Sequence, residues 1–166
     1  MKRIIFIFLL IALLSFNLFA QAEITPEEYD FYSKFLRREC VIRRFTESID
    51  SIYIKAAKKK MPQIPKELVE DFNLKNGKSY RIEDKLKGFK FTDQPKPNFD
   101  TTKEIVFVFD EINSVSRAGF TKDKKQALIF LSRSFEAVAS GDAGIYWLVY
   151  KNGNWEIKDS FQPWIH

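Results

Sequence analysis

The pair Asn152-Gly153 constrains this chain more than any other feature, because it joins two runs of strand-forming residues. Asn-Gly is the preferred sequence of a two-residue type I′ turn, in which both central residues take positive φ. The turn fixes the pairing of the flanking strands, predicted at 145–151 and 154–158, so that Tyr150 faces Trp155. The chain therefore has to contain an antiparallel sheet that includes this hairpin.

The register of the hairpin divides its side chains between two faces, because successive residues of a strand point to opposite sides. We expect one face to be core, and it carries Tyr146, Leu148, Tyr150, Trp155 and Ile157. We expect the other face to be partly solvated, since it carries Ile145, Trp147 and Val149 together with Glu156 and Lys158.

Further strands are predicted before the hairpin. The apolar run Ile105–Phe109 is typical of a buried strand, and residues 115–121 and 126–135 are two more candidates. Residues 49–55 are predicted to form a short strand, because isoleucines alternate there with Ser and Tyr. The stretch 78–103 contains a glycine and two prolines with little periodicity, so we expect it to be mostly irregular.

Two helices are predicted in the N-terminal half. Thr25 can cap the first, Pro26 suits its first position, and acids follow, so this helix should run from Pro26 to about Arg38. The second should open at Pro65 and end at Asn76-Gly77. The predicted fold is therefore α+β, with two N-terminal helices packed on an antiparallel sheet that ends in a three-strand meander. By analogy it is cystatin-like or nuclear-transport-factor-like.

The first 22 residues have the organisation of an export signal. Lys2 and Arg3 precede an apolar run from Ile4 to Phe19, and Ala20-Gln21-Ala22 offers a small-x-small cleavage pattern. A membrane-spanning helix needs about 20 apolar residues, which is longer than this run. We expect cleavage after Ala22, an exported protein that is periplasmic or secreted, and one domain at 23–166. An uncleaved N-terminal anchor is the alternative.

The composition of the chain excludes some kinds of structural and functional site. The chain has 166 residues with one His and one Cys, which excludes an internal disulfide framework and the usual His/Cys zinc sites. Cys40 is expected to be a small buried side chain. Residues 34–60 contain nine basic and three acidic residues. This segment is a candidate contact for an anionic surface, although we favour a solvated face and a loop tip as its explanation. Nucleic acid is not an expected partner of an exported protein, and no cofactor is expected.

Several blocks of the chain resemble a group of small exported bacterial proteins of unknown function. The blocks are Glu28-Tyr29-Asp30-Phe31-Tyr32-Ser33, the segment 65–72, Ser116-Arg117-Ala118-Gly119-Phe120, Gln126-Ala127-Leu128, Gly144, Gly153-Asn154-Trp155 and Trp164. Some members of that group carry two cysteines before the penultimate strand, whereas 132–143 has none here. The segment before Ser116 is also shorter than in the group. The resemblance implies an envelope context and a fold, and no activity.

Candidate functional residues are few. Arg117 is a candidate binding residue, because a guanidinium can bind a carboxylate or phosphate with two hydrogen bonds. We favour a structural role for the whole block, with Gly119 allowing a bulge or close packing, Phe120 in the core, and Arg117 paired locally or facing solvent. Asp110 and Glu111 follow an apolar run and are the other candidates. The single histidine is the terminal His166, which makes a Ser-His-Asp triad an unattractive hypothesis.

Two functions are compatible with this inventory. The first is a non-enzymatic domain that binds a protein or small-molecule partner in the cell envelope. The second is a carboxylate-dependent hydrolase that uses acids such as Asp110, and such catalysis needs two placed carboxylates. Adjacent acids do not face each other on a helix or strand, so we favour the binding domain and assign no catalytic or metal residue.

Overall fold

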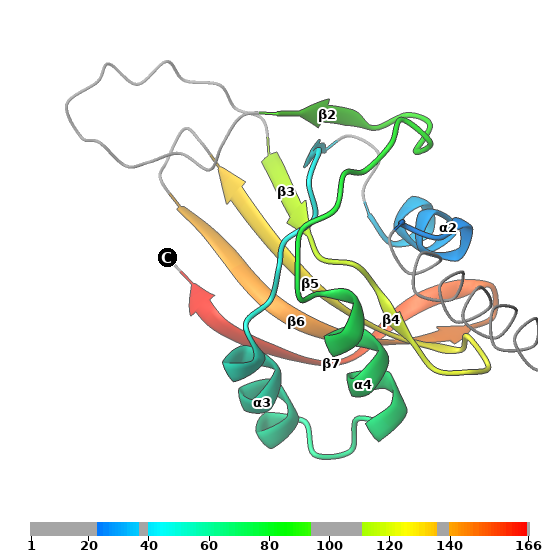
Figure 1. The fold of residues 1–166 in the computed structure, drawn as a ribbon, viewed down its shortest axis with the longest axis vertical. Coiled ribbons are helices and arrows are strands. Elements are labelled where there is room, and N and C mark those ends of the chain that lie inside the picture. The colour runs from blue at the N-terminus through cyan, green and yellow to red at the C-terminus, as the bar shows by residue number, and fades with distance from the viewer. Residues whose placement is uncertain (1–22, 37–39, 94–110, 136–139, 166) are drawn as a thin grey trace, which may run out of the picture.

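The structure is a computed structural model that describes residues 23–36, 40–93, 111–135 and 140–165. Its fold is α+β, as predicted: these residues form three helices and a seven-stranded mixed sheet (Figure 1). The helices are α2 (Pro26–Phe35), α3 (Ser51–Lys60) and α4 (Lys66–Lys75). The strands are β1 (Val41–Arg43), β2 (Lys90–Thr92), β3 (Glu111–Val115), β4 (Gly119–Phe120), β5 (Gln126–Phe135), β6 (Ser140–Lys151) and β7 (Asn154–Ile165).

The helix α2 begins where the sequence predicts. The Thr25 side chain accepts from the backbone N–H of Glu28, and the Glu28 carboxylate accepts in return from the backbone N–H of Thr25, which completes a capping box. Pro26 occupies the first turn. The helix ends at Phe35 because Leu36 is extended, so it is shorter than the predicted end near Arg38.

The predicted strand at 49–55 is wrong, because α3 occupies 51–60. The side chain of Asp50 accepts from the backbone N–H of Ile52 at 2.9 Å and caps the helix. The buried residues are Ile54 and Ala57, three positions apart, which is helical and not strand spacing. The fold thus contains a helix that the sequence analysis missed. The predicted helix after Pro65 is present as α4, and it ends at Asn76.

The sheet has the order β2-β1-β3-β5-β6-β7, and β4 pairs with β5. The strands β5, β6 and β7 form the predicted antiparallel meander. The prediction of an antiparallel sheet is wrong at the other side, because β1 runs parallel to both β2 and β3. A parallel pair needs a long crossover connection, and α3 and α4 lie in the chain between β1 and its two parallel neighbours.

The predicted strand 115–121 is interrupted. The strands β3 and β4 both pair with β5, and residues 116–118 separate them. In this break the hydroxyl oxygen of Ser116 accepts the backbone N–H of Phe130 at 2.9 Å, so a side chain replaces a missing partner of the ladder. The predicted strand Ile105–Phe109 lies outside the described residues.

The C-terminal hairpin has the predicted turn and register. Asn152 and Gly153 take φ of 51° and 86°, and Tyr150 pairs with Trp155. The pairing shifts further along: Leu148 pairs with Ile157 and Trp147 pairs with Asp159, so Lys158 forms a β-bulge. A second shift lies between Ala143 and Ile145 of β6.

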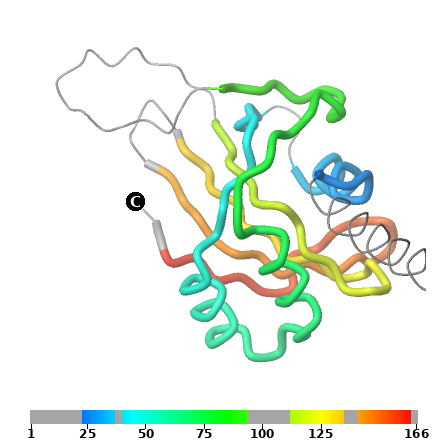
Figure 2. The backbone as a smooth tube through the Cα atoms, in the orientation of Figure 1, coloured from blue at the N-terminus to red at the C-terminus, as the bar shows by residue number. Residues whose placement is uncertain are grey.

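Helices cover both faces of the sheet. The helix α2 packs on one face, against residues that include Ile129, Tyr146 and Leu148. The helices α3 and α4 pack on the other face, and Figure 2 traces them across the strands β5 to β7. This second cluster includes Leu128, Phe130, Ile145 and Trp147 from the sheet.

This arrangement corrects two predictions about the hairpin. Ile145 and Trp147 are each 2% exposed, because α3 and α4 cover the face that was predicted to be partly solvated. On the predicted core face, Tyr146 and Leu148 are buried, whereas Tyr150 and Ile157 are 36% and 54% exposed. The two exposed residues lie toward the end of the hairpin, where the sheet is less completely covered.

Candidate binding groove

Arg117 is a buried residue whose ligand is a carboxylate of its own chain. Its side chain is 1% exposed and that of Glu28 is 0% exposed. The guanidinium donates from Nε to Glu28 Oε1 at 3.1 Å and from Nη2 to Oε2 at 2.7 Å. Nη2 also donates to the backbone carbonyl of Glu23 at 2.7 Å. The bidentate geometry predicted for a ligand is therefore used inside the protein.

Backbone groups complete the environment of this ion pair. The carboxylate of Glu28 also accepts from the N–H of Ala118 at 3.2 Å and from that of Thr25 at 2.9 Å. The ring of Tyr80 lies 4.7 Å from the guanidinium carbon of Arg117. Burial opposes the charge of Arg117, but the hydrogen bonds and charge of Glu28 outweigh it and raise the pKa of Arg117. The pair is an internal support, closed to an outside ligand.

Two further buried side chains tie the break between β3 and β4 to the helices. Asn76, at the end of α4, accepts the N–H of Arg117 and donates to its carbonyl, at 2.8 and 2.9 Å. The hydroxyl of Tyr32 donates to the carbonyl of Ser116 at 2.9 Å. Burial, followed by the charge of Glu28, raises the pKa of Tyr32 well above its ordinary value.

The other candidate residues do not join this cluster. Asp110 lies outside the described residues, and Glu111 begins β3 opposite Phe135, its side chain not being described. Within the described ranges, no group of three or more His, Cys, Asp or Glu side chains could hold a metal ion. Of the three candidates, Arg117 is the one whose side chain is described, and it has a structural role.

The residues of the recognised sequence blocks serve the packing and the turn. A Cβ on Gly119 would lie 2.6 Å from Cβ of Phe72, so the glycine lets α4 approach the sheet. Gly144 similarly adjoins Gln162 on β7, and Trp164 pairs through its backbone with Ala143. Phe120, 6% exposed, packs in the cluster beneath α2.

A groove lies between α2, the β4–β5 turn and the tip of the β6–β7 hairpin. Its volume is about 450 Å³, within the range of roughly 300–1,000 Å³ that is usual for small-molecule sites. We call it the aromatic groove, and its lining is Pro26, Glu27, Asp30, Phe31, Lys34, Phe120, Lys124, Tyr150 and Trp155. No sequence motif predicted it, because its residues come from three separate segments of the chain: α2, the β4–β5 turn and the β6–β7 hairpin.

Four aromatic rings form the apolar part of the aromatic groove. Phe31 meets Trp155 edge to face with centroids 5.0 Å apart, and it meets Phe120 in the same way at 5.6 Å. The rings of Tyr150 and Trp155 lie 5.2 Å apart. This mutual packing fixes the rings before any ligand arrives.

Charged groups of both signs form the rim of the aromatic groove. Asp30 and Lys34 form an ion pair at 2.8 Å, and the ammonium of Lys34 lies 5.8 Å from the ring centroid of Tyr150. The ammonium of Lys124 lies 5.4 Å from that of Phe120. Hydrogen bonds from its own backbone amide and from Thr25, with attraction to Lys124, lower the pKa of Glu27.

The aromatic groove also contains polar atoms that have no hydrogen-bond partner within the described protein. These are the hydroxyl of Tyr150 and the indole N–H of Trp155, each of which has ring contacts as its interactions. By contrast, the indole N–H of Trp147 donates to Gln126, and the hydroxyl of Tyr146 accepts from Gln162. Both residues line the aromatic groove, so these two donors remain available to solvent or to a ligand.

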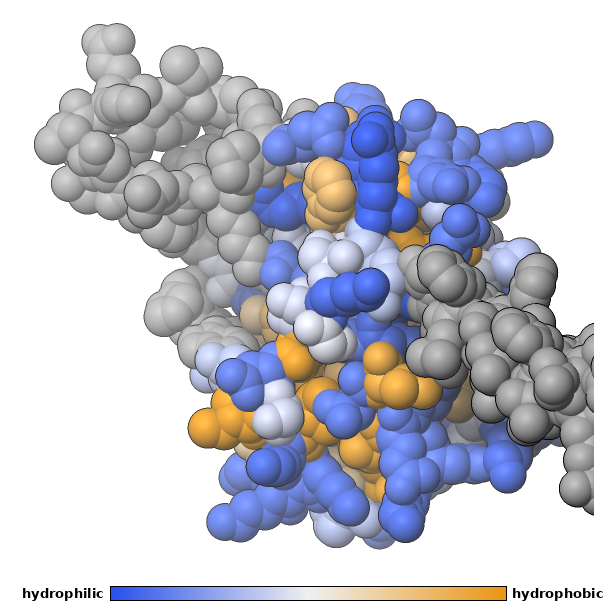
Figure 3. Space-filling model, in the orientation of Figure 1, coloured by the Kyte–Doolittle hydropathy of each residue, from blue (hydrophilic) through white to orange (hydrophobic). Residues whose placement is uncertain are grey.

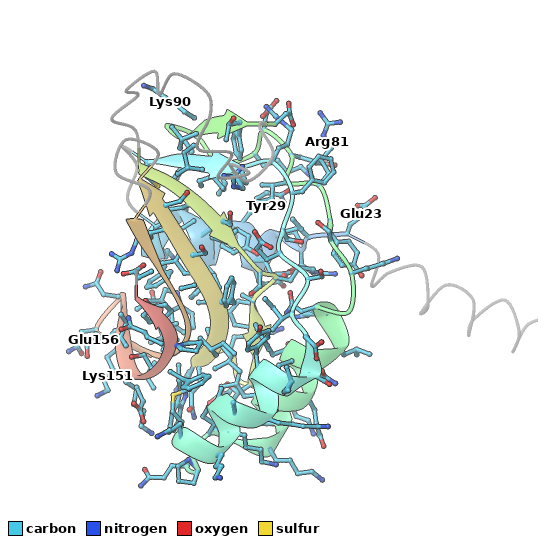
Figure 4. All side chains as sticks on the ribbon, turned by 90° about the vertical axis from the view of Figure 1, so that its left-hand side faces the viewer. Glu23, Tyr29, Arg81, Lys90, Lys151 and Glu156 are labelled. Carbon is cyan, nitrogen blue, oxygen red and sulfur yellow. The ribbon has the colours of Figure 1, made fainter. Side chains whose placement is uncertain are left out.

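In two smaller cavities, polar lining groups already have partners within the protein. One of about 290 Å³ is lined by residues that include Cys40, Arg133, Tyr146 and Gln162. In this cavity Arg133 is ion-paired with Asp142, and Cys40 is 6% exposed. The other, of about 200 Å³, is lined by residues that include Glu23, Tyr29 and Arg81, all of which are labelled in Figure 4. There the hydroxyl of Tyr29 already accepts the N–H of Glu83.

The basic segment 34–60 does not form one patch. Lys34 lies in the aromatic groove, Arg43 is 7% exposed, and Arg44 pairs with Asp84 at 2.7 Å. Four exposed lysines remain together on α3, at positions 55, 58, 59 and 60. Figure 3 shows the face of α3 and α4, where polar side chains surround smaller apolar areas.

The described part of the chain contains no helix that is long and apolar enough to cross a membrane. Comparison with known proteins found no matching family model, no matching curated protein and no matching solved structure.

Proposed function

We propose that this protein is an exported, non-enzymatic binding domain that takes its ligand in the aromatic groove. The observation that carries the proposal is the pair of donors on Tyr150 and Trp155, two lining residues of the aromatic groove that have no hydrogen-bond partner within the described protein. Tyr150 is exposed and Trp155 is partly buried, so each donor can bind water or a ligand that displaces that water. Here the partner is expected to be a ligand.

Export rests on the N-terminal sequence and is supported by contacts at the start of the domain. Cleavage after Ala22 would leave Glu23 as the first residue. The carbonyl of Glu23 is held by Arg117, and Ile24 is 7% exposed. A chain that begins at Glu23 keeps all of these contacts. The finer fold assignment, cystatin-like or nuclear-transport-factor-like, stays a prediction that rests on a helix packed against a curved sheet.

The side chains of the aromatic groove favour binding over catalysis. Of its two carboxylates, Asp30 is ion-paired with Lys34, and the pKa of Glu27 is lowered, so Glu27 is a poor proton donor near neutral pH. A carboxylate-dependent hydrolase needs one acid with a raised pKa beside a second carboxylate. We therefore expect a ligand to be released from the aromatic groove without any chemical change.

Indole resonances test the proposal. The protein, expressed from residues 1–166 with ¹⁵N and purified from the fraction in which it accumulates, is mixed with glycan, peptide and lipid fractions of the cell envelope. We expect the indole N–H signal of Trp155 to shift with one of them. The indole of Trp147 is the internal control, because it is buried and donates to Gln126. Unchanged Trp155 signals with every fraction would overturn the proposal.

A further inference from the structure

We infer that the ligand of the aromatic groove is a neutral oligosaccharide. The inference rests on the proposed function and names the class of ligand. It follows from three properties of the aromatic groove: the balance of its charges, the kind of hydrogen-bonding groups at its rim, and the rings at its base.

The charge balance favours a ligand without a strong net charge. The lining contains two carboxylates, Glu27 and Asp30, and two ammonium groups, Lys34 and Lys124, so its formal charge is zero. A cationic ligand would lie beside the ammonium groups of Lys34 and Lys124, which are 5.8 and 5.4 Å from the ring centroids of Tyr150 and Phe120 and would repel it. An anionic ligand would meet the two exposed carboxylates of α2. A neutral ligand avoids both repulsions.

The hydrogen-bonding groups match hydroxyl groups. Glu27 and Asp30 are acceptors, whereas Lys34, Lys124 and the indole N–H of Trp155 are donors. A sugar hydroxyl both donates and accepts, so neighbouring hydroxyls of one ring can satisfy the two kinds of group together. The apolar C–H face of the same sugar ring can lie against an aromatic ring. The half-exposed ring of Tyr150 offers such a surface.

A proline-rich peptide is the main competitor, since such peptides dock in grooves lined by aromatic residues. Its backbone presents carbonyl oxygens and lacks the N–H groups of the prolines. The indole N–H of Trp155 would suit those carbonyls, but the carboxylates of Glu27 and Asp30 would face acceptors without a donor. The aromatic groove therefore fits a sugar better than a polyproline helix.

Affinity measurements with defined probes test the inference. Chitohexaose, maltohexaose and cellohexaose represent neutral oligosaccharides, and a decaproline peptide represents the competitor. We expect one oligosaccharide to bind by calorimetry and to shift the Trp155 indole signal, with no shift from decaproline. Binding of decaproline without any oligosaccharide would overturn the inference and leave the proposed binding function intact. If none of these probes binds while an envelope peptide or lipid fraction shifts Trp155, the inference also falls.

Variants connect the binding to the aromatic groove. Tyr150→Ala removes a half-exposed ring and should lower the affinity for the oligosaccharide at least about tenfold. Tyr150→Phe keeps the ring but removes the hydroxyl, and Glu27→Gln keeps the shape but removes the charged acceptor. Each should lower the affinity by roughly threefold to tenfold. Glu156→Gln is the matched control. Glu156 follows Trp155 in β7, so its side chain is on the face opposite to that of Trp155, and it is exposed. Figure 4 labels it. Equal affinity of Tyr150→Ala and the wild type would overturn the inference.

The state of the sugar after incubation separates binding from hydrolysis. Chromatography of the bound oligosaccharide should recover it at its original length. Shortened products that disappear in Glu27→Gln would confirm the ligand class and overturn the non-enzymatic part of the proposed function.

Discussion

Arg117 and Glu28 lie 89 positions apart in the chain and form a bidentate ion pair that is almost fully removed from solvent. The pair joins the first turn of α2 to the break between β3 and β4. The hydrogen bonds that the Glu28 carboxylate accepts from Arg117 and Ala118 therefore also restrain the position of α2 over the sheet. Because α2 supplies one wall of the aromatic groove, this pair sets the shape of the proposed site without touching its ligand.

Removing one partner of this pair should be costly. Glu28→Gln leaves the guanidinium of Arg117 buried without a counter-charge, and we expect a loss of about 3–5 kcal/mol in the free energy of unfolding. Arg117→Met should cost a similar amount. The double variant should be less destabilised than the sum of the two, by about 0.5–3 kcal/mol. Urea denaturation of the four proteins measures this coupling. Additive losses would show that the two residues act independently.

An exposed ion pair serves as the control. Lys66 and Glu70 lie 3.4 Å apart on α4, with side chains 82% and 63% exposed. We expect Glu70→Gln to change the free energy of unfolding by less than about 0.5 kcal/mol, because solvent and salt screen such pairs.

Stability should fall at alkaline pH through Tyr32. Burial raises the pKa of this hydroxyl in the folded protein, whereas an unfolded tyrosine ionises near pH 10. The contribution is therefore fully present below about pH 10 and is lost as the pH rises from there toward the folded-state pKa. Tyr32→Phe should cost about 1–3 kcal/mol near pH 7, since the carbonyl of Ser116 loses its donor.

In Tyr32→Phe, the free energy of unfolding should decrease less between pH 9 and pH 11 than it does in the wild type. Denaturant melts of wild type and Tyr32→Phe at several pH values measure the difference. Parallel pH profiles would contradict the assignment of this effect to Tyr32.

Gly119 should be intolerant of a side chain. A Cβ there would lie 2.6 Å from Cβ and 2.7 Å from Cα of Phe72, so α4 would have to move away from β4. We expect Gly119→Ala to destabilise the protein by about 1–3 kcal/mol. Gly77→Ala is the control, because nothing lies within 4 Å of its Cβ position, and it should be close to neutral. Thermal melts of both variants are sufficient, and equal melting temperatures would argue against close packing at Gly119.

The hairpin variants should rank by conformation and burial. Gly153→Val places a β-branched residue at φ of 86°, which should cost about 1–3 kcal/mol. Trp155→Ala removes a half-buried ring whose centroid lies 5.0 Å from that of Phe31. We expect it to lower the free energy of unfolding by about 1.5–3 kcal/mol. Glu156→Ala changes an exposed side chain and should cost less than about 0.5 kcal/mol. Denaturant melts give the order, and a loss for Glu156→Ala as large as that for Trp155→Ala would contradict the register.

Local signals in the sequence were sufficient for the elements whose geometry is decided locally. Asn152-Gly153 determines its own turn, and Thr25 with Pro26 determines the start of α2. The error at 49–55 has a physical reason as well. Alternating isoleucines resemble a strand over a few residues, but the Asp50 cap and burial of Ile54 and Ala57 are decided by a helix packing on the sheet.

The candidate site was beyond local reasoning. The aromatic groove brings together Phe31, Phe120, Tyr150 and Trp155 from three separate segments, and no spacing rule connects them. Glu28 was interpreted as an acid that favours the start of a helix, although Thr25 and Glu28 have the spacing of a capping box. Its second role as the partner of Arg117 depends on the break between β3 and β4, which the sequence showed as one continuous strand.

The bulge at Lys158 has a consequence for the protein in concentrated solution. The strand β7 is the last strand of the described sheet and is twelve residues long, so the backbone groups that point away from β6 form its edge. Lys158 breaks the regular row of N–H and C=O groups, and its ammonium lies 3.8 Å from the ring centroid of Trp147. A second chain that tried to extend the sheet would meet a twisted edge and a fixed positive charge, as in natural edge strands that resist aggregation. The protein should therefore stay dispersed when it is crowded, despite a long open edge.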